Sequence, residues 1–318
     1  MKLSFLIPRT ALLVLAGLAI AGAVRATQVT FWRTSCPLDG AETRIFEKVS
    51  SDSMGGWDSD GCRYSTSGQW REYELSTCPQ DLFTLKAEDF MGPFDDAVVA
   101  RLKEEAARVR AEYPNPDALQ IWDRYALAVR FYRILGRDDA FLADLYLRAS
   151  WTARDAAVGV YTGLDGPEDA AKILEQGALE LARQLSPAQR KTVLYNLARV
   201  AHRAGENALR DRYLDQFAAR DDLDAAEQEA LARFRKMSRE IEPKFQDLAL
   251  ESWKTWLQRT DLVAGDVLEV TWLQADLLRR RDRPDEALAL YRKVASDASA
   301  PPEVRKMASF FERRLTRP

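Results

Sequence analysis

The sequence VTWLQADLLRRRDRPDEALALYRKVA, from Val270 to Ala295, carries the clearest structural pattern in this chain of 318 residues. Apolar residues recur at helical spacing on both sides of Pro284, which predicts two helices joined by a short turn. The small side chains of Ala275 and Ala287 allow the paired helices to approach closely, and Tyr291 fills the space towards the next helix. The segment therefore predicts a packed pair of helices.

Two other segments have a similar pattern: residues 193–217, with Leu197, Ala198 and Gly205 in register, and residues 122–151, which keep Tyr132 and Gly136. The three pairs resemble tetratricopeptide repeats, and their equivalent turn positions are Gly136, Gly205 and Asp282. The turn positions are separated by about two repeat lengths, since one repeat is about 34 residues long. Stacked pairs of this kind form an α-solenoid with a concave binding face. An irregular helical bundle with chance spacing is the alternative.

Residues 97–318 are accordingly predicted to form a tetratricopeptide-like helical domain. Ala, Leu, Arg and Glu dominate this part, and its prolines stand at junctions. Helices are expected near residues 96–112, 117–135, 138–158, 167–184, 187–204, 207–219, 223–239, 245–258, 264–281, 284–297 and 302–316. Because each pair would pack mainly against its neighbours, this part is expected to fold without the rest of the chain.

Residues 27–96 form a second predicted module, which we call the head. Short β-type runs occur at residues 29–32 and 70–75, and the Gly, Ser and Asp cluster of residues 50–68 predicts a loop. The head has 6 basic and 13 acidic residues, a net charge of −7, whereas the helical part carries about +1. The predicted fold class is mainly α, an α-solenoid with a small N-terminal β and loop module.

Residues 1–26, MKLSFLIPRTALLVLAGLAIAGAVRA, have the pattern of a secretory signal peptide. Basic residues precede an apolar run from Ala11 to Val24, which as a helix is too short for the roughly 30 Å hydrocarbon core of a bilayer. Cleavage is predicted after Ala26, with cleavage after Ala23 or retention as an anchor as the alternatives. The mature protein is expected to be periplasmic or secreted, without a stable membrane span.

The composition excludes several classes of protein. With 47% hydrophobic and 30% charged residues, the chain is an ordinary globular protein. Three cysteines and one histidine exclude multi-site zinc and haem proteins. The net charge of −3, which becomes more negative when the signal peptide is removed, argues against a nucleic-acid binder. No nucleophile elbow, metalloprotease motif, phosphate-binding loop or dinucleotide fingerprint occurs in the sequence.

Two of the three cysteines stand in the same motif, Cys-Pro-x-Asp, at Cys36 to Asp39 and at Cys78 to Asp81. A zinc ribbon needs two Cys-x-x-Cys turns, since four thiolates arranged as a tetrahedron satisfy the ion. Each turn here keeps the first cysteine and has aspartate in place of the second. The repeat indicates a degenerate zinc ribbon.

On these residues, the chain resembles a bacterial family of uncharacterised proteins with a Cys-Pro-x-Cys-Gly zinc-ribbon head and a tetratricopeptide-like helical body. In the head the resemblance runs through residues 36–40, 76–79 and 88–90, and in the body through Leu145 to Arg154, LYLRASWTAR. It covers roughly residues 30–220. The resemblance implies the fold and brings no known activity.

If the ribbon backbone implied by the family is retained, Cys36 and Cys78 lie close together. In an oxidising compartment neighbouring thiols form a disulfide, and closing this loop would stabilise the head by roughly 4 kcal/mol in the chain-entropy model. A disulfide between Cys36 and Cys78 is therefore predicted, without a cofactor. The alternatives are a pairing that involves Cys62, and a mixed metal site, with zinc as the ion, formed by Cys36, Asp39, Cys78 and Asp81.

Other polar residues carry weaker signals. Asp52, Asp58 and Asp60 do not have the spacing of a calcium loop, and a solvated acidic loop is the interpretation that we prefer. His202, the only histidine, is interpreted as a surface or groove residue of a helix. No pair of carboxylates stands out among the 49 acidic residues.

The predicted function is an exported protein-interaction scaffold or adaptor, with a protein or peptide partner in the cell envelope and no catalysis. Repeat-like helices and the lack of catalytic motifs favour it. The alternatives are an envelope hydrolase that uses two carboxylates about 5 to 9.5 Å apart, and a metal- or redox-responsive module built on the two Cys-Pro-x-Asp motifs.

Overall fold

The computed structural model describes residues 27–159 and 164–316. The predicted signal peptide, residues 1–26, lies outside the described residues. The prediction of a mainly helical chain with a small N-terminal module is confirmed. In the described part of the chain, no helix combines the length and the apolar character needed to cross a bilayer.

The head consists of two antiparallel hairpins. β1 (Gln28–Ser35) pairs with β2 (Glu42–Ser50), and β3 (Leu75–Thr77) pairs with β4 (Thr84–Lys86), which leads directly into the short helix α2 (Ala87–Phe90). A β-type run at residues 70–75 was expected, but Trp70–Glu72 forms a 3-10 helix and the strand begins only at Leu75. Tyr73, the aromatic residue after this turn, is exposed and contacts Phe46 of β2.

The helices lie close to their expected bounds. They are α3 (Asp96–Glu112), α4 (Ile121–Ile134), α5 (Asp139–Val158), α6 (Pro167–Leu181), α7 (Pro187–Ala204), α8 (Asn207–Ala218), α9 (Ala225–Lys236), α10 (Glu242–Trp256), α11 (Ala264–Arg280), α12 (Pro284–Ser296) and α13 (Pro302–Thr316). Ser186 and Asp224 cap α7 and α9 by accepting hydrogen bonds from the third backbone amide of each helix.

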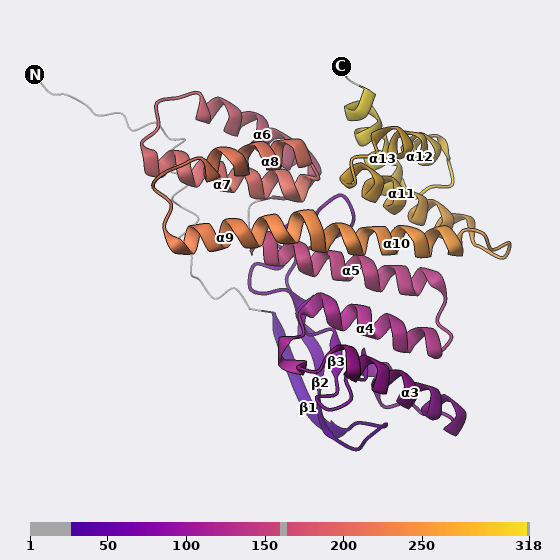
Figure 1. The fold of residues 1–318 in the computed structure, drawn as a ribbon. Helices are drawn as coiled ribbons and strands as arrows, with labels where there is room; N and C mark the ends of the chain where they lie inside the picture. Colours follow the sequence, from indigo (N-terminus) through magenta and orange to yellow (C-terminus); the bar gives the residue numbers. More distant parts are fainter. Residues whose placement is uncertain (1–26, 160–163, 317–318) are drawn as a thin grey trace, which may run out of the picture.

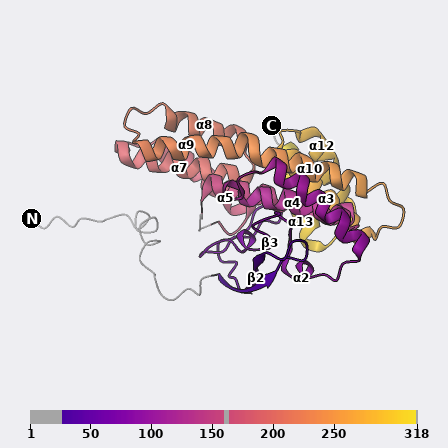
Figure 2. The ribbon, with the colours of Figure 1, turned by 60° about the horizontal axis from the view of Figure 1, so that its bottom comes forward.

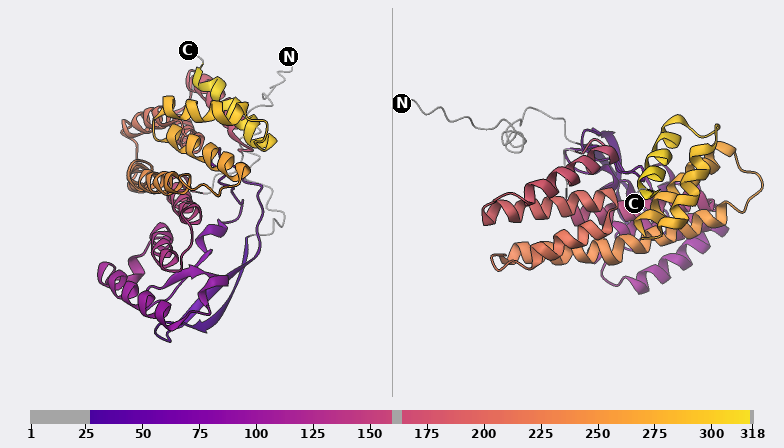
Figure 3. Two further views of the ribbon diagram at one scale, coloured as in Figure 1. Left: turned by 90° about the vertical axis from the view of Figure 1, so that its right-hand side faces the viewer. Right: turned by 90° about the horizontal axis from the view of Figure 1, so that it is seen from above.

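Figure 1 shows α9 and α10 running across the middle of the molecule, with α5, α4 and α3 stacked on one side. Two groups of helices, α6–α8 and α11–α13, lie on the other side, next to each other when seen from above (Figure 3). The strands of the head pack below α4 (Figure 2).

The three predicted turn positions share one backbone conformation. Gly136, Gly205 and Asp282 have φ angles of +76°, +71° and +56°, in the left-handed region. Gly205 closes α7 and Asp282 follows α11, so each turns the chain into the second helix of a packed pair. The aspartate is one of the few residues other than glycine that tolerate this conformation.

The expected break between residues 223–239 and 245–258 is not present. α9 and α10 form one continuous helix through a π turn at Met237–Ile241. Pro243 has no backbone N–H and interferes with the regular hydrogen bonds of the preceding turn, and a π turn accommodates such a mismatch without ending the helix. The continuous helix packs along α5 and lies between the stack of α3, α4 and α5 and the two other groups of helices (Figure 1).

The boundary at residue 96 is not a break in the hydrophobic core. Leu75, Phe83 and Leu85 of the head belong to the same buried cluster as residues of α3, α4 and α5. Phe83 contacts Phe131 of α4 edge to face, with ring centroids 5.1 Å apart. The head therefore covers an apolar face of the helices.

Candidate functional site

The two Cys-Pro-x-Asp motifs form the same turn at the end of a strand. In the first, Cys36 follows β1, its carbonyl oxygen accepts from the amide of Gly40, and the carboxylate of Asp39 accepts from the amide of Ala41. Gly40 has a φ of +78°. The aspartate thus closes the turn through its side chain, as aspartates commonly do.

The second turn repeats this pattern after β3. The carbonyl oxygen of Cys78 accepts from the amide of Leu82, and the carboxylate of Asp81 accepts from the amide of Phe83. Leu82 takes the place of Gly40, with a φ of +61°. Two turns of one geometry therefore face each other, each with one thiol and one carboxylate.

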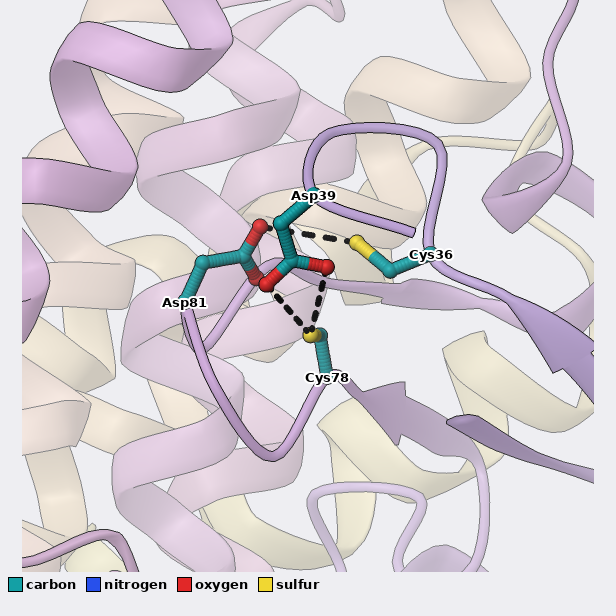
Figure 4. Close-up of side chains that lie close together, drawn as sticks. All are labelled: Cys36, Asp39, Cys78 and Asp81. Atoms are coloured by element: carbon teal, nitrogen blue, oxygen red, sulfur yellow. Dashed lines mark hydrogen bonds between the residues drawn. The ribbon is translucent and has the colours of Figure 1, made fainter. Parts of the chain in front are cut away.

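The side chains of the two cysteines and the two aspartates converge on one point, which we call the convergent site (Figure 4). A sulfur or carboxylate oxygen from each of Cys36, Asp39, Cys78 and Asp81 lies within 4.8 Å of the others. The thiol of Cys36 donates to Asp81 at 3.5 Å, and the thiol of Cys78 donates to Asp39 at 3.6 Å, so each thiol is paired with the carboxylate of the opposite turn. Both cysteines are buried, whereas the aspartates reach solvent.

This environment keeps the Cys36 thiol protonated. The adjacent Cys78 side chain and then burial raise the pKa of Cys36 far above the usual range, and the nearby carboxylate of Asp81 acts in the same direction. A thiol of this kind is a poor nucleophile, because the thiolate is the reactive form. A bound cation would reverse this effect, since a coordinating thiol loses its proton.

The residues fit a divalent metal ion. Two thiolates and two carboxylates are ligands that zinc accepts in tetrahedral sites, and each aspartate keeps one oxygen in its turn hydrogen bond while the other is available. The same convergence suits a disulfide, because it brings the two sulfurs together. The structure has the three cysteines as free thiols, so the disulfide and the metal site both stay predictions.

We expect the protein purified after export to contain a Cys36–Cys78 disulfide and less than one zinc ion per chain. Expression in an oxidising compartment favours the disulfide, and two carboxylates in place of two thiolates make a harder and less zinc-selective site. Peptide mapping without reductant and elemental analysis of the same sample measure both quantities. Reduction should lower the stability by up to about 4 kcal/mol.

Cys62→Ser is the control for this measurement, and it should leave the mapped disulfide unchanged. One tightly bound zinc ion per chain, with Cys36 and Cys78 both reduced, would contradict the prediction. That outcome would instead make Cys36, Asp39, Cys78 and Asp81 the metal ligands.

A second cluster of polar side chains lies where the head meets the helices. Its centre is Arg154 of α5, whose side chain has no exposed surface. The Arg154 guanidinium donates to Asp58 at 2.9 Å, to Asp60 at 2.6 Å and to Glu242 of α10 at 2.7 Å. One buried cation thus joins the head loop to two helices.

The cluster extends to both other groups of helices, through Arg203 of α7 and through Arg279 and Arg280 of α11. Arg203 donates to Asp58, and its guanidinium lies 3.8 Å from the ring centroid of Tyr64. Arg279 and Arg280 both donate to Asp276 and to the hydroxyl group of Ser59. Nearly all of these charges are paired, as burial requires.

The interpretation of residues 58 and 60 as a solvated acidic loop is wrong. Asp58 and Asp60 are 3% and 0% exposed, because the loop reaches into the space between the helices and meets their arginines. Desolvation opposes the charge of Asp60, but Arg154 and Arg280 hold its pKa below the usual range. Asp52 is partly exposed and accepts hydrogen bonds from the backbone and hydroxyl groups of residues 65–67.

His202 is not a surface residue, which corrects its interpretation as a surface or groove histidine. It is 4% exposed, and its Nε2 lies 2.8 Å from Oε2 of Glu242. Burial lowers the pKa of His202, so the imidazole is neutral at pH 7. Burial opposes the charge of Glu242, but Arg154 and His202 lower the pKa of this carboxyl to about 2.

Cys62 lies in this second cluster and not with the other two cysteines. Its electrostatic neighbours are Arg71, Asp58 and Arg154, and burial raises its pKa to about 12. It is therefore an inert buried thiol in the structure, and the alternative pairing that involves Cys62 has no geometric support.

A family of known sequences matches most of the described chain. The sequence model of a family described as an uncharacterised protein conserved in bacteria, DUF2225, matches residues 36–241. The chain belongs to this family. The match begins at Cys36, the first residue of the convergent site, and ends in the π turn between α9 and α10. No curated protein and no solved structure is significantly similar to the chain.

The family supplies no residue roles, so the chemistry follows from the geometry alone. The sequence pattern identified the four residues of the convergent site, and the structure brings these four together. The sequence pattern did not identify the buried arginines. One signal was present, since Arg154 stands seven residues after Leu147, on the buried face of α5. An arginine at such a position needs a buried acidic partner.

Proposed function

We propose that this protein is an exported protein-interaction scaffold, which binds an apolar side chain of a protein or peptide partner in the cell envelope. The observation that carries the proposal is a hollow of about 640 Å³ where the head, α4, α5 and α9 meet. Its size lies within the range of about 300 to 1,000 Å³ that is usual for binding sites.

Tetratricopeptide-like packing supports a binding role for the helices. Ala275, Ala287 and Tyr291, predicted as the two small and one aromatic packing residues, are completely buried. In each of the helix pairs α4–α5, α7–α8 and α11–α12, a residue in the left-handed conformation stands in the turn between the two helices, and the two helices pack against each other. Repeats of this kind use their surfaces to bind partners.

The chemistry of the hollow suggests what the partner presents. Most of its exposed wall is apolar, with contributions from Ile121, Trp122 and Met237. Arg233 and Lys236 stand at its edge, exposed and without an acidic partner among the described residues. A large apolar side chain flanked by carboxylates would match both features, because the apolar group fills the hollow and the acids meet the cations.

The alternative of a carboxylate hydrolase has one feature in its favour. Glu72 and Asp155 both line this hollow, and burial raises the pKa of each carboxyl group. Arg71, however, donates to both oxygens of Asp155, at 2.5 and 2.8 Å. A carboxylate held in this way is not available as a nucleophile or acid, so we prefer the scaffold.

Selection from a random peptide library displayed on phage tests the proposal with the exported protein as bait. We expect enriched peptides to share a Trp, Phe or Leu next to Asp or Glu. Trp122→Ala should weaken the binding of a selected peptide at least tenfold, because the substitution removes an apolar wall of the hollow. Lys236→Glu, an exposed substitution that leaves this wall intact, should weaken it by repelling the acids.

Two exposed residues away from the hollow provide matched controls. Trp32→Ala on β1 and Lys254→Glu on α10 should leave peptide binding unchanged. Thermal melting of each variant checks that the fold is retained. Selected peptides without the acidic and apolar pattern, or peptides whose binding is insensitive to both Trp122→Ala and Lys236→Glu, would contradict the proposal.

A further inference from the structure

A separate hollow of about 350 Å³ lies between the head and α5, and nothing in the proposed function uses it. Its lining comes from the end of β2 and the following residues, from the loop around Arg63, from the 3-10 helix and from α5.

The positive charge of the head is concentrated at this hollow. The head has 6 basic residues against 13 acidic ones, yet Lys48, Arg63 and Arg71 all line the hollow, and Arg148 of α5 adds a fourth cation. Asp52 is the only acid among the lining residues. A site of this composition on an otherwise acidic module attracts anions locally.

Two of the four cations are already neutralised. Arg71 is bonded to Asp155, and Arg148 is bonded to Asp144 and Glu74. Lys48 and Arg63 are exposed and have no carboxylate partner among the residues that the structure describes. These two side chains are therefore the ones that can bind a negatively charged group.

The same hollow carries two tryptophans and a row of hydroxyl groups. Lys48 lies over the ring of Trp70, at 5.4 Å from its centroid, and Arg148 lies over Trp151 at 5.9 Å. Such contacts hold each cation beside an aromatic ring. The hydroxyl groups are those of Ser51, Ser53 and Ser65, and Ser65 donates to Asp52 at 2.7 Å.

We propose that this hollow binds an acidic sugar, in which one ring carries both hydroxyl groups and a carboxylate. The carboxylate would bind Lys48 and Arg63, and the ring hydroxyls would exchange hydrogen bonds with the exposed hydroxyl groups of Ser51 and Ser53. The C–H face of the sugar ring would pack against the indole of Trp70. A site with apolar aromatic walls and a few placed polar groups is the usual form of a small-molecule pocket.

Calorimetric titration of the whole exported protein tests the proposal with three probes: glucuronate, glucose and inorganic phosphate. Glucuronate should bind saturably, at least tenfold more tightly than glucose, which lacks the carboxylate. It should also bind more tightly than phosphate, which lacks the ring. Added salt should weaken the binding, since the two cations are exposed.

Variants separate the site from the rest of the surface. Lys48→Gln combined with Arg63→Gln should weaken glucuronate binding at least tenfold. Trp70→Ala should weaken the binding of glucuronate and of glucose to the same extent. Arg44→Gln is the matched control, because Arg44 is an exposed cation of the same strand β2 that lies over Phe31 and does not line the hollow. Trp122→Ala, which tests the proposed function, should not change sugar binding.

Two results would overturn the proposal. One is glucuronate binding no more tightly than glucose, which would mean that the cations do not recognise the carboxylate. The other is phosphate binding as tightly as glucuronate, which would mean that the hollow takes any anion and does not recognise the sugar ring.

Discussion

Replacement of Arg154 by methionine is expected to lower the free energy of unfolding by about 3–5 kcal/mol, the usual cost of removing one partner from a buried ion pair. The variant leaves Asp58, Asp60 and Glu242 buried with fewer cations around them. Among the described residues, the only ion-pair partner that Asp60 then keeps is Arg280, at 3.8 Å. Glu242 keeps only His202, which is neutral at pH 7. Denaturant unfolding followed by circular dichroism measures the change.

An exposed ion pair supplies the control for this substitution. Arg283→Met breaks the contact with Glu286, in which both side chains are about half exposed, and should cost no more than about 1 kcal/mol. Adding Asp60→Asn to Arg154→Met should recover part of the loss, because it removes a carboxylate that has lost its nearest cation. A cost for Arg154→Met as small as that for Arg283→Met would contradict the buried network.

Residues 97–318, expressed without the head, are expected not to fold cooperatively. This replaces the expectation from the repeat pattern that the helical part is stable alone. Removing the head takes Asp58 and Asp60 from the buried arginines Arg154, Arg203 and Arg280, and it takes the Ser59 hydroxyl group from Arg279 and Arg280. It also exposes the apolar face of α3, α4 and α5 that Phe83 and its neighbours cover.

The combined loss should exceed the roughly 5–15 kcal/mol by which a folded domain is usually stable. Thermal melting followed by circular dichroism, together with binding of a hydrophobic dye, measures the outcome. We expect a broad melt, low helicity and strong dye binding. Adding separately purified residues 27–96 should partly restore the helicity. A sharp melt at the temperature of the intact chain would show that the helices fold without the head.

Helix positions were predictable because they depend on short-range signals. Apolar spacing, caps such as Ser186 and left-handed turn residues such as Gly205 act within a few residues of one another. The exception was Pro243, whose effect depends on whether the chain can form a π turn while it packs along α5. Proline alone does not distinguish a helix end from a local change of helix type.

The convergent site was predictable for a different reason. Cys36 and Asp39 stand in a motif that recurs at Cys78 and Asp81, and a repeated turn motif with metal-type spacing implies that the two turns face each other. The sequence did not distinguish a disulfide from a metal site, since both need the same approach of the two sulfurs.

The sequence by itself determined the helices, their pairing through Gly136, Gly205 and Asp282, and the two facing turns of the head, because local periodicity and repeated motifs encode them. Only the tertiary structure decided where the acidic loop of the head lies. The arginine partners of Asp58 and Asp60 are 94 or more residues away along the chain, on helices whose relative positions no local pattern specifies. A buried charge is stable only beside its partner, and that partner becomes known only once the chain is folded.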